Sequence, residues 1–333
     1  MKANNRRAFL KRSAAATLSL PLVKSLEEYA LAESDVPPAA ASAVKSTTSG
    51  AAPADGEAMP MGQIAGQPFS RLIMGGNLIA GWSHSRDLSY VSTLMRRYNT
   101  PAKIRETLEL GESQGITAIN SYVMDDNTQI FEHWKAGGKI KWFAQARMDE
   151  SGGFSQIQKA VDQGASGIHL NGNACEDLLN QGAFEKIGES VRFIRAQKRI
   201  AGVSAHDLRV IIECEKAGVD VDFYQKTFHS LDYYTAPRPG ETGALGPHDN
   251  AWCQDPQAVI DFMAQIKKPW IAFKILAAGA IQPRAAFPFA FNSGADFILV
   301  GMFDWQVVED TKLAKRVINV VAGANSKRTR PWC

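Results

Sequence analysis

The sequence has no uninterrupted apolar run of about eighteen residues, the length that a helix needs to cross a lipid bilayer. We therefore expect no stable membrane span. Cysteine is also scarce, with four residues among 333, and no two of them form a CxxC pair. Their spacing matches no zinc ribbon, and it leaves the pairing of any disulfides open. Hydrophobic residues make up 45% of the chain and charged residues 21%, which is ordinary for a globular protein with a large core.

Residues 1–32 are typical of an export signal rather than of a folded domain. Arg6 and Arg7 precede an apolar pair and a lysine, residues 13–23 are mildly apolar, and small residues at 30 and 32 provide a cleavage site. The segment resembles a twin-arginine signal, which implies passage through the twin-arginine translocase and a periplasmic or otherwise exported location. The alternative is a basic amphipathic helix on a cytoplasmic protein.

The apparent basicity of the chain lies in that segment. Removing residues 1–32 takes away six of the 37 basic residues and two of the 34 acidic ones, which leaves 31 against 32, a net charge of −1. We therefore expect no nucleic-acid partner. Residues 33–64 are rich in Ala, Pro and Ser and predict a flexible linker. A barrel domain over 65–325 and a short C-terminal tail over 326–333 complete the expected organisation.

Strand-like and helix-like segments alternate along the predicted domain. The eight expected strands are 71–77, 117–123, 140–148, 167–171, 200–206, 220–229, 270–276 and 296–302. Thr100-Pro101, Pro256 and Pro283 mark helix starts between them. Eight such units predict a single-domain (β/α)₈ TIM barrel. An open doubly wound sheet is the alternative, but the first strand is followed by no GxGxxG turn.

Chemistry in such a barrel lies at the carboxyl ends of the strands, and side chains alternate between inward and outward along each strand. Alternation predicts the following inward residues: Asn120, Tyr122, Gln145, Arg147, His169, Asn171, Ser204, His206, Gln225, His229 and Lys274. The three histidines fall at the ends of successive strands, beside Lys274. We therefore expect them to converge at the rim as catalytic residues.

Three converging imidazoles could bind a divalent metal such as Zn²⁺, Mn²⁺ or Fe²⁺. The predicted ligand set is His169, His206 and His229, with Asp304 or water completing it. The alternative is that these imidazoles bind substrate hydroxyls or one another. Lys274 could form a Schiff base or stabilise charge, and we favour charge stabilisation because a lone lysine is rarely sufficient for imine chemistry.

Two predicted loops are too long to be simple connections. The loop over 77–100 carries Trp82, and the loop over 230–255 carries Tyr234, with further aromatic and basic residues in both. Such residues could stack on a sugar ring. The alternative is that these loops are disordered or form contacts between subunits.

The middle of the chain resembles the aldo-keto reductases. Gly202-Val203-Ser204, the spacing of Gln225 and His229, and His169 in GIHLNGN match that family's pattern, weakly, from about residue 70 to 305. The resemblance implies an NADP cofactor near Ser204 and Gln225, and a catalytic role for His169. Gly279 and Gly301 lie at the ends of strands seven and eight, where barrels commonly bind phosphate, so they are further cofactor candidates.

The sequence differs from that family at the positions of its catalytic and cofactor-binding residues. Asn120 stands where the family has its catalytic aspartate, and Gln145 stands where it has its lysine. The family's catalytic tyrosine would fall at Asp125, and Tyr122 lies too early in the chain to take its place. Ala205 stands where the family has an asparagine that helps to hold the nicotinamide. Asparagine and glutamine cannot lower the pKa of a tyrosine that donates a proton.

These departures favour non-redox chemistry. We expect an exported lyase or isomerase acting on a small, polar, sugar-like carbonyl or hydroxy compound. The alternatives are an NADP-dependent reductase with a different proton donor, and a barrel that binds a ligand without catalysis. The expected substrate contacts are Asn120, Tyr122, Gln145, Arg147, Asn171, Trp82 and Tyr234.

Overall fold

A computed structural model describes residues 58–82, 88, 90–124, 128–149, 151–236, 253–323 and 326–333. The chain divides into two compact units, Met1–Ser49 and Gly50–Cys333, and every described residue belongs to the second. The expected export signal and most of the expected linker lie outside the described residues, as does Asp125. No helix in the described part of the chain is long and apolar enough to cross a membrane.

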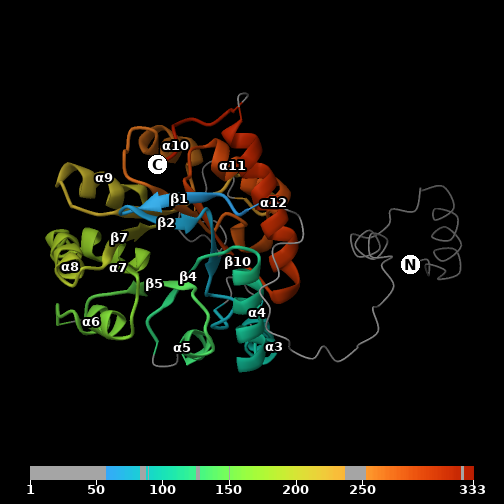
Figure 1. The fold of residues 1–333 in the computed structure, drawn as a ribbon. Helices are drawn as coiled ribbons and strands as arrows, with labels where there is room; N and C mark the ends of the chain where they lie inside the picture. The colour runs from blue at the N-terminus through green and yellow to red at the C-terminus, as the bar shows by residue number, and fades with distance from the viewer. Residues whose placement is uncertain are drawn as a thin grey trace, which may run out of the picture. The chain divides into compact units, whose positions relative to one another are not determined.

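Eight parallel strands close into a barrel in the order β10-β3-β4-β5-β6-β7-β8-β9 (Figure 1). They are β3 (Leu72–Gly75), β4 (Ala118–Tyr122), β5 (Lys141–Ala146), β6 (Gly167–Leu170), β7 (Ile200–Ala205), β8 (Phe223–Thr227), β9 (Trp270–Phe273) and β10 (Phe297–Gly301). The predicted (β/α)₈ barrel is therefore confirmed. Each predicted strand overlaps an observed one, although the observed strands are shorter.

Helices surround the barrel on its outer side (Figure 1). They are α3 (Tyr90–Tyr98), α4 (Pro101–Ser113), α5 (Thr128–Lys135), α6 (Ser155–Asp162), α7 (Gly172–Asn180), α8 (Glu185–Ala196), α9 (Leu208–Lys216), α10 (Pro256–Met263), η1 (Ala277–Gly279), α11 (Pro283–Asn292) and α12 (Asp304–Ala322). Thr100 caps α4 by accepting a hydrogen bond from the Lys103 N–H, and Asp255 caps α10 in the same way. The predicted proline starts of α4, α10 and α11 are confirmed because proline suits the first turn.

An antiparallel hairpin, β1 (Met61–Ile64) and β2 (Gln67–Ser70), precedes the barrel. Its turn residues Ala65 and Gly66 both have positive φ, as a tight two-residue hairpin turn requires. Hairpin side chains join the apolar layer at the amino-terminal end of the barrel, where the Phe69 and Phe143 rings lie 4.9 Å apart. The expected linker therefore ends before residue 61, and the hairpin closes this end of the barrel.

The last residues also pack against the amino-terminal end, where the sequence predicted only a tail over 326–333. Arg328 forms a buried ion pair with Asp296 at 2.8 Å, and the Cys333 N–H donates to the same carboxylate at 2.9 Å. The Trp332 ring lies between two guanidinium groups, 4.0 Å from that of Arg71 and 3.7 Å from that of Arg328. Buried ion pairs and cation–π contacts thus hold this segment onto the domain.

Candidate functional site

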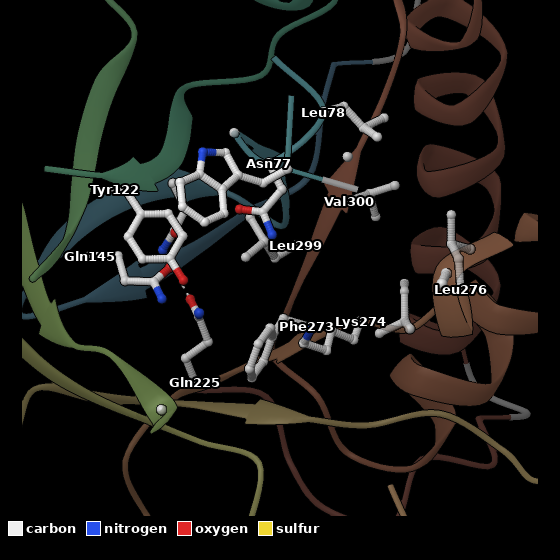
Figure 2. Close-up of a pocket in the computed structure, with 18 of the residues that line it drawn as sticks. Asn77, Leu78, Tyr122, Gln145, Gln225, Phe273, Lys274, Leu276, Leu299 and Val300 are labelled. Carbon is white, nitrogen blue, oxygen red and sulfur yellow. Dashed lines mark hydrogen bonds between the residues drawn. The ribbon is translucent and has the colours of Figure 1, made fainter. Parts of the chain in front are cut away.

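A pocket of about 380 Å³ opens at the carboxyl ends of the strands, within the range of small-molecule sites. Its two sides differ in chemistry. Figure 2 shows Tyr122 and Gln225 on one side and Leu78, Val300 and Leu276 on the other. A pocket at this end of the barrel is where the fold places active sites.

Amide side chains form the floor of the polar side. Asn120 Nδ2 lies 2.7 Å from His169 Nε2 and donates to Gln225 Oε1 at 3.0 Å. Gln225 Nε2 in turn donates to Ser204 Oγ at 3.4 Å. With Nε2 accepting from Asn120, His169 carries its proton on Nδ1, 3.2 Å from the Leu170 carbonyl oxygen. Each polar group in this network forms a hydrogen bond with another member, and these bonds fix the orientation of the amides that face the pocket.

His169 is fully buried below the floor and does not line the pocket. Burial lowers its pKa from the ordinary 6.5 to about 4, because the charged imidazolium would lose its hydration. The ring is therefore neutral near pH 7. His169, predicted as catalytic, instead holds Asn120 in place.

His229 is also buried and is bound through both ring nitrogens. Nδ1 donates to the Ser230 carbonyl oxygen at 2.9 Å, and Nε2 accepts from the Cys253 N–H at 3.1 Å. Burial lowers the pKa of His229 to about 4. The ring fastens the start of the segment before α10 to the end of β8 and does not line the pocket.

His206 does line the pocket, and a carboxylate from α7 orients it. His206 Nδ1 lies 3.2 Å from Glu176 Oε1 and 3.3 Å from Oε2. The same carboxylate accepts the backbone N–H groups of His206 and Asp207. Gly172 begins α7 beside the ring, where a Cβ atom would lie only 3.0 Å from His206 Cε1. Glu176 thus selects the Nδ1–H tautomer, and Nε2 is the nitrogen that can exchange a proton.

A buried lysine completes the support of this histidine. Lys226 Nζ donates to the carbonyl oxygens of His206 at 2.6 Å and Thr227 at 2.9 Å. The side chain of Lys226 faces the helices and not the barrel axis, as its place next to the inward Gln225 requires. Burial lowers the pKa of His206; Glu176 opposes this effect, and the charges of Lys274 and Lys226 add to it. The imidazole is therefore neutral, and able to act as a base, at pH 7.

Lys274 lines the pocket as predicted, but strand alternation is not the reason for this orientation. Simple alternation around an inward Lys274 would place Ile271 and Phe273 on the outer face of the strand. In the structure Ile271 belongs to the interior apolar layer and Phe273 lines the pocket. Lys274 lies just after β9 with φ of 57°, and this left-handed backbone turns its side chain toward the pocket.

The structure does not bring the four predicted metal ligands together. No group of three or more His, Cys, Asp or Glu side chains that could hold a metal ion occurs among the described residues, which include all four predicted ligands. His169 and His229 are buried and lie outside the described pocket lining, with both nitrogens of each ring within hydrogen-bonding distance of a partner. Asp304 begins α12, where it accepts from the Tyr98 hydroxyl at 2.6 Å and from Lys103 Nζ at 2.9 Å. The imidazoles do not converge because they lie at different depths of the barrel.

Most of the other predicted residues reach the pocket. Its lining includes Asn120, Tyr122, Gln145, Asn171, Ser204, Gln225, Gly279, Gly301 and Trp82. Trp82 stacks on Tyr122 with ring centroids 5.6 Å apart, and Asn171 Nδ2 donates to the Tyr122 hydroxyl at 3.2 Å. Arg147 and Tyr234 were predicted as substrate contacts, but both are exposed and neither belongs to the described lining.

Glu176 is the functional residue that alternation could not identify. It lies on a helix, where a glutamate normally faces solvent, and contacts His206 because α7 follows β6 directly. The available signal was the short spacing between Asn171, which caps α7, and this glutamate one helical turn later. The apolar lining at Leu78 and Leu276 was likewise unexpected.

No family model and no curated protein sequence matches the chain. Among solved structures, the chain resembles PA4992 of Pseudomonas aeruginosa, assigned as an aldo-keto reductase, with a TM-score of 0.50 and 14% identity over 78% of this chain and 94% of that one. It also resembles Gox0644 in the apo form, with a TM-score of 0.53 and 10% identity over 83% and 97%. A variant of Gox0644 in complex with NADPH gives 0.50 and 9% over 78% and 94%. At these identities the likeness establishes the barrel fold alone.

Proposed function

We propose that the protein is an enzyme that moves a proton at the carbon next to a carbonyl group, as lyases, isomerases and epimerases do. The carrying observation is the Glu176–His206 pair at the rim of the pocket, with Lys274 also in the lining. A carboxylate that orients a neutral imidazole is a common arrangement for a general base. The substrate is a small carbonyl or hydroxy compound.

The reaction follows from the groups at the pocket. His206 Nε2 takes the proton from carbon, and the C–H electron pair forms a C=C bond while the carbonyl π electrons move to oxygen. The ammonium of Lys274 and the amides on the floor stabilise that oxygen, where negative charge develops. Return of the proton to the other face of the same carbon gives epimerisation. When that carbon bears a hydroxyl group, transfer of the hydroxyl proton to the alkoxide and return of the first proton to the former carbonyl carbon give isomerisation. In a lyase reaction His206 instead takes the proton of a β-hydroxyl group, whose oxygen forms a new C=O bond while the electrons of the breaking C–C bond form the enolate.

Exchange of substrate hydrogen with solvent tests this proposal without a known product. The protein is incubated in D₂O with a panel of aldoses, ketoses and 2-oxo acids, and proton NMR follows the signal of the hydrogen next to the carbonyl. We expect loss of that signal for one class of compound, and at least a hundredfold slower loss with His206→Gln, because general base catalysis contributes about 10²–10⁴. Exchange at the same rate in wild type and variant would contradict the proposal.

A reductase is the second candidate, favoured by the barrel neighbour that binds NADPH. Gly279 and Gly301 in the pocket lining would then approach the cofactor phosphates. NADPH fluorescence that changes on titration, together with its oxidation in the presence of an aldehyde, would support this reading. NADPH binding without solvent exchange in the D₂O panel would favour the reductase over acid–base chemistry.

We also propose that the twin-arginine pathway exports the protein, on the basis of Arg6 and Arg7. Replacing both by lysine in an exporting bacterial host is expected to move most of the protein from the periplasmic to the cytoplasmic fraction on immunoblots. Lys24→Gln changes a charge in the same segment and serves as the control. Unchanged periplasmic yield with the double variant would rule out this route.

A further inference from the structure

The pocket has an apolar wall that the proposed proton transfer does not use. Its members are only half-buried, so each leaves apolar surface facing the cavity: Leu78, Val91, Met95, Leu276, Leu299 and Phe303. They come from the segment after β3, from α3, and from the ends of β9 and β10. A ligand that covers this wall removes apolar surface from water, which favours binding.

A polyol does not suit this wall. Hydroxyl groups against Leu276 or Leu78 would lose their hydrogen bonds to water and find no donor or acceptor in return. The expected sugar-like substrate therefore fits the amide side but not the opposite side. Figure 2 shows the two sides facing each other across the pocket.

The charge of the pocket lining indicates which polar group the ligand carries beside its apolar part. Among the described lining residues, Lys274 is the only lysine or arginine, and none is an aspartate or glutamate. The lining thus favours a negative ligand over a positive one. In Figure 2, Lys274 lies between Gln225 on the amide side and Leu276 on the apolar side.

We propose that the pocket binds a small carboxylic acid with a carbonyl group and a hydrocarbon chain, such as a medium-chain 2-oxo acid. The carboxylate contacts Lys274, the carbonyl oxygen faces the amides of Asn120 and Gln225, and the chain lies on the wall of Leu78 and Leu276. This inference rests on the proposed function, because the carbonyl and its adjacent carbon must lie near His206.

Isothermal titration with a chain-length series tests the proposal. The probes are pyruvate, 2-oxobutanoate, 2-oxohexanoate and 2-oxooctanoate, with glucose and fructose as polyol comparisons. We expect Kd to fall by about fourfold for each added methylene until the wall is covered, as burial of a CH₂ group predicts. The sugars should bind at least tenfold more weakly than 2-oxohexanoate.

Two substitutions separate the contribution of the hydrocarbon chain to binding from that of the carboxylate. Leu276→Asn is expected to reduce the gain per methylene to less than twofold, whereas Leu94→Asn, on an exposed leucine of α3, leaves it unchanged. Lys274→Met is expected to raise the Kd for 2-oxohexanoate at least tenfold, while the Kd for the neutral amide of this acid stays unchanged. Circular dichroism on each variant confirms that the barrel is intact.

The outcomes distinguish this inference from the proposed function. A Kd that does not depend on chain length, or tighter binding of sugars than of acids, overturns the inference even if solvent exchange is observed. Chain-dependent binding of the acids without any solvent exchange supports the inference about the ligand and overturns the acid–base function.

Discussion

Lowering the pH from 7 to 4 is expected to reduce the free energy of unfolding by about 3 to 4 kcal/mol, chiefly through two buried histidines. His169 and His229 have pKa values near 4 in the folded protein, against an ordinary 6.5. Between these values the unfolded chain binds protons that the folded protein does not, so stability falls as the pH falls. Each shift corresponds to about 3 kcal/mol at pH 4.

One carboxylic acid acts in the opposite direction. Burial raises the pKa of Asp310 on α12 to about 6, so the folded protein takes up a proton there before the unfolded chain does. This recovers roughly 2 kcal/mol of the loss at pH 4. Asp310→Asn should therefore steepen the decline in stability below pH 6.

Urea denaturation followed by tryptophan fluorescence at pH 7, 6, 5 and 4 measures these effects. Glutamine does not titrate, so His169→Gln and His229→Gln should each remove about half of the histidine contribution, whatever stability they lose at pH 7. If the double variant loses stability with pH as steeply as wild type, the assignment of acid sensitivity to these two rings is wrong.

Substitutions at the rim are expected to have the largest effects on turnover. Removing the base with His206→Gln should lower kcat/KM for the exchanged substrate by about 10²–10⁴. Removing the positive charge with Lys274→Met should lower it by about 10²–10³, because charge on the substrate oxygen is then less stabilised in the transition state. Lys135→Met, on an exposed lysine of α5, is the matched control.

Glu176→Gln tests whether the carboxylate acts through the imidazole. Burial places the pKa of His206 below 6.5, and Glu176 raises it, so removing this charge lowers the pKa further. The acidic limb of the kcat/KM–pH profile, set by protonation of the base, should therefore move to lower pH while the maximum rate falls. Glu132→Gln, which changes an exposed carboxylate on α5, should leave the profile in place. A fall in rate without a shift of the limb would mean that Glu176 only supports the local structure.

The barrel could be predicted from sequence because strands and helices alternate with clear caps. The inward positions of Asn120, Gln145 and Gln225 followed from alternation, and the structure places all three at the pocket. Alternation failed at β9 because the lowest layer of the barrel interior is itself apolar. Ile271 packs there with Phe143 and other aromatic rings, so an apolar side chain does not mark the outer face.

For a different reason, the sequence could not show that the three histidines fail to converge. Alternation gives the direction of a side chain but not its depth along the barrel axis. His169 pairs with Gly202 of β7, four residues before His206, and its ring centroid lies 6.2 Å from that of Phe223. Glu176 was missed because its contact with His206 depends on how α7 packs beside β7, and alternation along the strands gives no direction for a helical residue.

The β1–β2 hairpin and the apolar layer at the amino-terminal end of the barrel close the pocket on that side. Ile64 and Phe69 from the hairpin, with Phe143 and Phe223, occupy the space beneath Asn120 and Gln225. In the part of the chain that the structure describes, a molecule that binds against those amides enters and departs at the carboxyl ends of the strands. For any reaction with two reactants, the one held deeper has to arrive first and depart last, so steady-state kinetics should show a compulsory order of addition.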